Sequence, residues 1–384
     1  MSRTTQILIA AALAVAILPP VALSQTRTAA VYKAPRLSDG HPDIGGFWTN
    51  STMTKLERDT KLGDRKVYTD EEARQIEGAN DARTARLNAP TDQAVIQNWT
   101  NANKSNDNAD ECQSGSRGAA CGYNAGWTDP GDRLMRVNGQ ARTSLVTNPA
   151  NGRIPAAKAG ARVARGPAAG AGEGEGEGGP PAARGGAGRG GGAVPAAGAA
   201  PRGGQYDNPE QAGLAMRCIM SFGRSTGPIM LSQLYNNNYR FVQTKDTVAI
   251  WVEMVHDVRI VRLNGKHRTD GIRPYMGDSI GHWEGDTLVV ETTNFPSSTN
   301  LNGSSANLKM TERFTRVKAD RLLYQFQAED PTVWDAPWGG EYEFARGTGV
   351  YEYACHEGNY ALEDVLAGAR AEEKASPARA SAAR

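Results

Sequence analysis

The C-terminal half of this chain is a dense series of short segments in which apolar and polar residues alternate. Each segment has the length of a β-strand, and turn-forming residues separate the segments with no helical pattern in between. They span residues 239–244, 247–254, 257–263, 279–283, 287–293, 308–317 and 321–328, with shorter candidates at 341–344 and 350–354. Consecutive strands without crossover helices pair with their neighbours. The sequence therefore predicts a mainly β fold, an antiparallel barrel or sandwich with a few peripheral helices.

The turns between these segments predict hairpins. The dipeptide of Asn264 and Gly265 is the strongest short hairpin signal, because both residues tolerate the positive φ of a type I′ turn. Further hairpin turns are expected at 245–246, 284–286 and 318–320. On the N-terminal side, residues 45–48 predict a strand. Thr69 is the expected N-cap of a helix to about residue 88, and a second helix is expected at 360–373.

One histidine, His256, lies in the middle of an apolar row within these segments. The residues of its parity are Val248, Ile250, Val252, Met254, Val258 and Ile260. In an unbroken strand this row looks into a core or cavity, while Trp251, Glu253 and Asp257 face the other way. A bulge or tight turn at residues 255–256 would change the parity and could bring Asp257 to the side of His256.

The first 24 residues have the pattern of a secretory signal peptide. Arg3 supplies the positive charge, residues 7–17 form the apolar core, and residues 22–24 fit a small-x-small cleavage site. Pro19 and Pro20 interrupt the apolar run, which is too short for a confident membrane span. We therefore expect a periplasmic or secreted protein without a transmembrane anchor after signal removal.

The charge balance argues against nucleic acid as a partner. The sequence has 43 basic and 42 acidic residues, and loss of Arg3 with the signal leaves 42 of each. Proteins that hold a nucleic-acid backbone normally carry a basic excess. A small molecule is the expected partner, and the sequence carries no signal for a particular oligomeric state.

Four cysteines in an oxidising compartment predict disulfides. Three pairings are possible, and we favour Cys112 with Cys121 and Cys218 with Cys355. The second bridge would tie the start of the strand series to its end. Buried free thiols are the alternative, and the spacing matches no zinc motif.

Composition divides the chain into parts of one domain. Residues 153–204 are almost entirely Gly, Ala, Pro and Arg, which cannot bury enough apolar area to offset the entropy of ordering, so we predict a disordered insertion. Residues 25–152 are expected to form the N-terminal part of the β-rich domain and residues 205–373 its main part. Residues 374–384 are expected to be a disordered tail.

Three stretches of the sequence resemble an uncharacterised family of exported bacterial proteins. They are Asp39-Gly40-His41-Pro42-Asp43, the run GHWEGDTLVVETTNF at 281–295, and the run YEYACHEGNY at 351–360. The resemblance covers residues 33 to 373 apart from the insertion. It implies export and implies no particular activity. The comparison with lipocalin-like barrels is an analogy from the strand pattern.

The candidate catalytic residues centre on His256. On an apolar wall an imidazole stays neutral and is able to act as a general base near neutral pH. Glu253 and Asp257 are the nearest carboxylates in sequence, and His356 follows Cys355, whose disulfide would fix its backbone. A hydrogen-bonded structural histidine is the alternative interpretation of His256. Nucleotide, metal and nucleophile motifs do not occur in the required context, so we predict neither a cofactor nor a metal.

The candidate ligand-binding residues are aromatic. Trp334 and Trp338 lie in a loop between prolines, where they could stack on a flat apolar molecule or equally close the barrel end as core. Trp251, Trp283 and Tyr239 are further candidates on or beside the strands.

Three functions fit these features. The favoured one is a β-barrel that binds a small apolar or aromatic molecule. The second is a cofactor-independent lyase, isomerase or hydrolase with His256 as general base, and the third is an envelope-associated structural protein. A pocket that contains an exposed His256 favours the enzyme over the binding protein. A filled barrel with His256 buried against a backbone carbonyl favours the structural protein.

Overall fold

The computed structural model describes residues 32–87, 129–159, 161, 208–212, 214–220, 229–232, 236–299, 301–357 and 359–375. The segments Met1–Tyr32 and Lys33–Arg384 form separate units, and the elements below belong to the second. The predicted signal peptide, Cys112 and Cys121 lie outside the described residues. So do most of the predicted insertion and the residues after 375.

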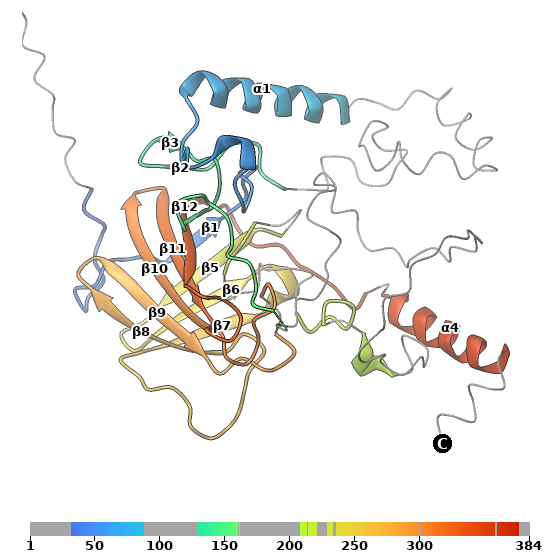
Figure 1. The fold of residues 1–384 in the computed structure, drawn as a ribbon. Helices are drawn as coiled ribbons and strands as arrows, with labels where there is room; N and C mark the ends of the chain where they lie inside the picture. The colour runs from blue at the N-terminus through green and yellow to red at the C-terminus, as the bar shows by residue number, and fades with distance from the viewer. Residues whose placement is uncertain are drawn as a thin grey trace, which may run out of the picture. The chain divides into compact units, whose positions relative to one another are not determined.

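Nine strands form a closed β-barrel, which confirms the predicted fold class (Figure 1). In sheet order they are β1 (Gly46–Thr49), β5 (Asn238–Gln243), β6 (Thr247–Val252), β7 (Val258–Leu263), β8 (Asp278–Glu284), β9 (Thr287–Thr293), β10 (Lys309–Lys318), β11 (Arg321–Glu329) and β12 (Trp338–Arg346). Pairing of β1 with β12 closes the barrel. The short strand β4 (Val146–Asn148) adds to β12, while β2 (Arg136–Val137) and β3 (Gln140–Ala141) form a separate pair.

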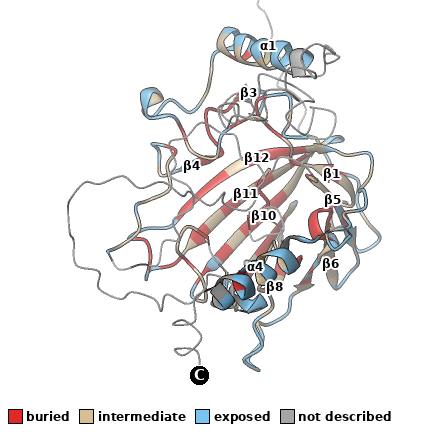
Figure 2. Ribbon diagram, turned by 90° about the vertical axis from the view of Figure 1, so that its right-hand side faces the viewer, coloured by how far each residue is buried: buried red, intermediate tan, exposed pale blue. Residues whose placement is uncertain are grey.

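The strands follow the alternation of the sequence. Along β11 every second residue is buried, from Leu322 to Ala328, and the residues between them are half-buried. Figure 2 shows this banding along β10 and β11. Because one row of each strand faces the interior, the apolar pattern sets both the strand and its register.

The pairing of β7 with β8 is parallel, which corrects the predicted hairpin at Asn264 and Gly265. A connection of residues 264–277 replaces the two-residue turn. The carboxylate of Asp278, at the start of β8, accepts hydrogen bonds from Arg262 and from the backbone N–H of Arg268. These contacts fold the connection back along β7, so tertiary contacts override the local turn preference.

Strand β12 begins earlier than the sequence predicts, and no further strand follows it in the described part of the chain. Its first residues include Gly339 and Gly340, which lower strand propensity. A Cβ added at these two positions would collide with the carbonyl oxygens of Phe326 and Leu145, so the close approach of the backbones requires glycine. Residues 350–354, predicted as a strand, have no regular secondary structure.

Two α-helices occur among the described residues, close to the predicted ranges. In α1 (Asp70–Leu87) the hydroxyl of Thr69 accepts from the N–H of Glu72, and Glu72 accepts from the N–H of Thr69. This reciprocal capping box confirms the predicted helix start. Helix α4 (Ala361–Ala375) follows the segment 350–357. Short 3-10 turns occur at η1 (Thr60–Leu62), η5 (Pro209–Gln211) and η6 (Met254–His256).

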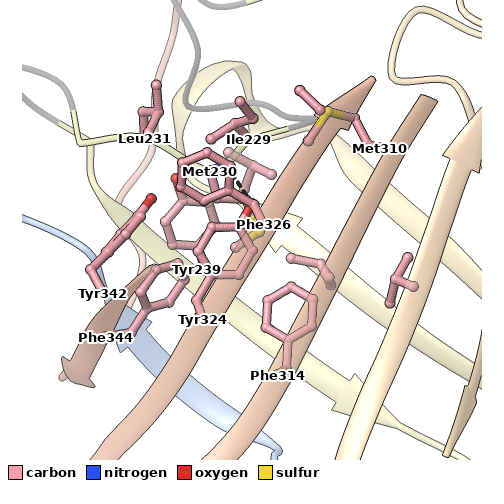
Figure 3. Packing of buried hydrophobic residues seen from close by; sticks show 14 of the residues in the cluster. Ile229, Met230, Leu231, Tyr239, Met310, Phe314, Tyr324, Phe326, Tyr342 and Phe344 are labelled. Atoms are coloured by element: carbon pink, nitrogen blue, oxygen red, sulfur yellow. Dashed lines mark hydrogen bonds between the residues drawn. The ribbon is translucent and has the colours of Figure 1, made fainter. Parts of the chain in front are cut away.

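Aromatic side chains fill the barrel interior (Figure 3). Fully buried rings include Trp48, Tyr239, Phe241, Phe314, Tyr324, Tyr342 and Phe344. They pack against the segment of Ile229, Met230 and Leu231, which is also buried. The described interior is thus a packed core, as expected for a barrel of this size.

Three aromatic residues predicted to bind a ligand belong to this core instead. Tyr239 has no exposed surface, and its hydroxyl oxygen accepts a hydrogen bond from the side-chain amide of Asn50 at 3.1 Å. The rings of Trp334 and Trp338 are buried and meet edge to face, with centroids 5.7 Å apart. Their loop between β11 and β12 turns inward, so these indoles close the barrel and line no open site.

Within the described residues, none of the helices is both long and apolar enough to span a lipid bilayer. The same part of the chain contains no cluster of three or more His, Cys, Asp or Glu side chains placed to hold a metal ion.

Candidate functional site

A tight turn breaks the strand at His256 and changes its predicted environment. Val255 has φ 64° and His256 has φ 46°, both in the left-handed region. After Val252 the chain forms η6, and β7 resumes at Val258 with the opposite parity. The strand is broken here and His256 is exposed, so the prediction that His256 faces the core is wrong. The alternative of a turn at residues 255–256 describes the observed geometry.

The backbone of this turn is strained. A β-branched residue such as Val255 rarely adopts positive φ, and the cost is of order 1 to 3 kcal/mol. The N–H of Val252 donates to the carbonyl of Asp257 at 2.9 Å, and the N–H of His256 donates to that of Glu253 at 3.1 Å. These hydrogen bonds and the burial of the Val255 side chain hold the turn. Strain of this kind is often found at functional sites.

The turn forms one wall of a surface pocket with a volume of about 450 Å³. The pocket is lined by Trp251, His256, Val350, Tyr351, Glu352, Tyr353 and Ala354. Three of these side chains are aromatic, while His256 and Glu352 supply the polar groups. The pocket lies outside the barrel, because Trp251 belongs to the outward row of β6.

A hydrogen bond to Glu253 and a disulfide to Cys218 help to hold the opposite wall, residues 350–354, in place. The buried Glu253 accepts from the backbone N–H of Tyr351 at 2.8 Å, and its other oxygen accepts from the N–H and the side-chain amide of Asn238. At the far end of the wall a disulfide joins Cys355 to Cys218, as predicted. Glu253 therefore positions the wall and does not line the pocket.

The tautomer of His256 follows from a contact of its Nδ1 atom. Nδ1 lies 3.3 Å from the carbonyl oxygen of Tyr353, across the pocket mouth from the turn. Since a carbonyl only accepts, we assign the proton to Nδ1, which makes Nε2 a hydrogen-bond acceptor. The lone pair of this tautomer is therefore on Nε2 of a residue that lines the pocket.

Asp257 sits beside His256 but is absent from the pocket lining. Burial raises the pKa of its carboxyl, while the backbone N–H of Val258 and the neighbouring His256 act in the opposite direction. The carboxylate accepts from the N–H of Val258 at 2.8 Å. Its role in the geometry is to start β7.

His356 and Trp283 lie apart from this pocket. His356 is exposed in the turn after Cys355 and does not line the pocket. The ring of Trp283 stacks on His41, with centroids 5.1 Å apart and planes 10° from parallel. Arg36 also pairs with Asp286, so two of the sequence motifs meet at one end of the barrel. Trp283 therefore packs against His41 and does not line the pocket.

The wall of residues 350–354 is the part of the site that sequence reasoning missed. The run 351–360 stood out as a motif, and Cys355 was predicted to be cross-linked, but the segment was expected to be a strand. No protein-family model, no curated protein and no solved structure matches this chain. The chemistry of the site therefore rests on its own geometry.

Proposed function

We propose that this β-barrel protein binds a small apolar or aromatic molecule in the surface pocket between His256 and residues 350–354. The observation that carries the proposal is the pocket itself, which has three aromatic walls and one histidine acceptor. Its volume of about 450 Å³ is within the range of small-molecule sites. The packed interior of the barrel favours this outer pocket over the lumen.

The chemistry of the lining supports this class of ligand. Trp251, Tyr351 and Tyr353 offer flat apolar surface with polar edges. Aromatic side chains of this kind stack on rings and cover hydrocarbon. The Nε2 acceptor of His256 would orient one hydrogen-bond donor of the ligand. A few polar groups in a mostly apolar wall are typical of specific small-molecule sites.

We also propose that the protein works in the periplasm or outside the cell, as an exported protein of the family that its motifs resemble. The disulfide between Cys218 and Cys355 supports an oxidising compartment. The signal-like pattern of residues 1–24 supports export.

The test of binding combines native purification with one defined probe. Mass spectrometry of the protein from its native host would identify a copurifying molecule, and calorimetry would measure 1-naphthol as a compact aromatic probe with a hydroxyl donor. We expect His256→Ala to weaken 1-naphthol binding by about tenfold, the value of one hydrogen bond. Its melting temperature should stay unchanged, because the side chain is exposed.

His282→Ala is the matched control, because His282 is also exposed and lies outside the pocket. It should bind 1-naphthol like the wild type. A protein that carries no ligand, fails to bind 1-naphthol and responds to His256→Ala only by a lower melting temperature would refute the proposal.

A second candidate function is proton transfer with His256 as general base, which an exposed His256 in a pocket supports. We place binding first because neither Asp257 nor His356, the predicted partners of this base, lines the pocket. The contact of Nδ1 with the carbonyl of Tyr353 favours it, because Nε2 is then the basic nitrogen on the ligand side. The reaction would be that of a lyase, isomerase or hydrolase. If the copurifying molecule is a substrate, His256→Gln should abolish turnover while the dissociation constant changes little. If His256→Gln reduced turnover and binding equally, His256 would contribute to binding and not to proton transfer.

A further inference from the structure

The pocket opens onto an exposed apolar strip on the outer face of the barrel. Trp251 on β6 pairs with Val258 on β7, and the next outward pair along the two strands is Ala249 with Ile260. Val258 and Ile260 expose 43% and 48% of their surface, although both are β-branched hydrocarbon side chains. Val242 on β5 pairs with Ala249 and is 45% exposed. We call these residues, Val242, Ala249, Val258 and Ile260, the outer track.

The outer track exists because the turn at His256 reverses the parity of the strand. Before the turn, the apolar row Val248, Ile250 and Val252 faces the interior. After it, Arg259 and Val261 take the interior positions, and the apolar row continues as Val258 and Ile260 on the outside. The strained turn therefore both shapes the pocket and places two apolar residues next to its aromatic wall.

The charged neighbours of the track are engaged elsewhere. The guanidinium of Arg240, on the row of Trp251, lies 5.4 Å from the ring of Phe47. Arg262, the next outward residue on β7, pairs with Asp278 at 2.8 Å. The strip between them is hydrocarbon that continues the pocket without a break, since Trp251 and Val258 are direct cross-strand partners.

We infer that the ligand is an amphiphile with a neutral hydroxyl head and an unbranched hydrocarbon tail. This inference rests on the proposed function and names the substrate class of the same site. The head lies in the pocket, where Nε2 of His256 accepts a hydrogen bond from the hydroxyl group and the acidic side chain of Glu352 disfavours an anionic head. The tail leaves the pocket past Trp251 and lies over Val258 and Ile260.

A homologous series of 1-alkanols from butanol to decanol tests this inference by calorimetry. Full burial of a CH₂ group tightens binding about fourfold, and a chain on an open face buries about half its surface, so we expect about a twofold lower Kd per CH₂. The affinity should stop increasing once the hydrocarbon tail of the alkanol extends beyond Ile260. Alkanoic acids of the same length should bind more weakly than the alcohols.

The double variant Val258→Thr, Ile260→Thr keeps β-branched side chains on the strand and removes apolar surface. It should flatten the alkanol series and leave 1-naphthol binding unchanged. The control Ile272→Thr changes an isoleucine that is 54% exposed in the connection between β7 and β8, and it should leave the series as in the wild type.

The two proposals fail in different ways. If 1-naphthol binds while alkanol affinity is independent of chain length, or if the double variant keeps the chain-length dependence, the track inference is wrong and the pocket stands. If neither 1-naphthol nor any alkanol binds, the proposed function fails with it. Binding of phosphatidylcholine vesicles without binding of alkanols would also overturn the inference, since the strip would then be a membrane contact.

Discussion

Arg259 and Glu312 form an ion pair inside the barrel, with side chains 3% and 0% exposed and 2.7 Å between Nη1 and Oε2. The hydroxyl of Tyr324 donates to the other oxygen of Glu312 at 2.8 Å. Burial raises the pKa of Tyr324 well above its usual range, so this hydroxyl remains a donor. Removal of water from two charges costs free energy, which the pair offsets only while both partners are present.

Glu312→Gln should therefore lower the free energy of unfolding by about 3 to 5 kcal/mol, because it leaves Arg259 buried without a counter-charge. The double variant Arg259→Met, Glu312→Leu should recover most of this loss, since it buries hydrocarbon of similar volume. Urea unfolding of the two variants measures both values. A double variant as unstable as Glu312→Gln would contradict this account of the pair.

Asp278 predicts a pH dependence of stability. Burial alone would raise the pKa of its carboxyl, but hydrogen bonds from Arg262, the N–H of Arg268 and His267 outweigh burial and lower the pKa to about 2. The carboxylate thus contributes about 2 to 3 kcal/mol at neutral pH relative to an ordinary pKa near 3.9. Because the folded-state pKa is lowered, this contribution is present above about pH 5 and is lost as the pH falls toward 2.

Chemical denaturation between pH 7 and pH 2 measures this effect. The wild type should lose about 2 kcal/mol more over this range than Asp278→Asn, whose amide does not titrate. Parallel profiles for the two proteins would show that the hydrogen bonds to Asp278 do not contribute to stability through its charge.

At the scale of elements, the disulfide and Glu253 hold the wall segment 350–354 at its two ends. The disulfide links residues separated by 137 positions, and the chain-entropy model assigns such a bridge about 5 kcal/mol, an upper value. The double variant Cys218→Ser, Cys355→Ser should lose up to this amount in urea unfolding. It should also bind 1-naphthol more weakly, because the wall then loses its covalent link at Cys355.

Reduction of the wild type with dithiothreitol should also lower stability and weaken 1-naphthol binding. This control distinguishes loss of the disulfide from any effect of the serine side chains. An oxidised and a reduced protein with equal affinity for 1-naphthol would mean that the disulfide does not position the wall.

Strands with regular alternation could be predicted from the sequence, and irregular ones could not. Thr287–Thr293 matches β9 at both ends, and Leu288, Val290 and Thr292 form one buried row along it. The first residues of β12 were missed because Gly339 and Gly340 are favoured by a close backbone contact, which strand propensity does not report. The parallel step from β7 to β8 depends on Asp278 and its distant donors.

The site could be predicted only in part, because some of its geometry depends on contacts between residues that are distant in sequence. Trp251 and His256 were identified as candidates and both line the pocket. The turn that exposes His256 needs positive φ at two residues that are neither Gly nor Asn, and so it carries no local sequence signal. The opposite wall depends on the hydrogen bond from Tyr351 to Glu253, 98 positions away in sequence.

At the scale of the whole molecule, closure of the barrel determines where a ligand is able to bind. Nine strands enclose an interior that large aromatic side chains fill, so the described lumen is core. The broken strand at residues 253–257 and the disulfide-linked segment 350–354 create a pocket outside this core. We therefore propose that the outer pocket, and not the lumen, binds the ligand.

One calorimetric comparison tests this claim most directly. Trp251→Ala removes an aromatic wall of the outer pocket, while Tyr342→Phe removes only a hydroxyl from the fully buried lumen. Loss of a stacking ring costs about 1 kcal/mol or more, so Trp251→Ala should weaken 1-naphthol binding at least fivefold and Tyr342→Phe should leave it unchanged. Wild-type affinity in Trp251→Ala together with weakened binding in Tyr342→Phe would place the ligand inside the barrel and contradict the account.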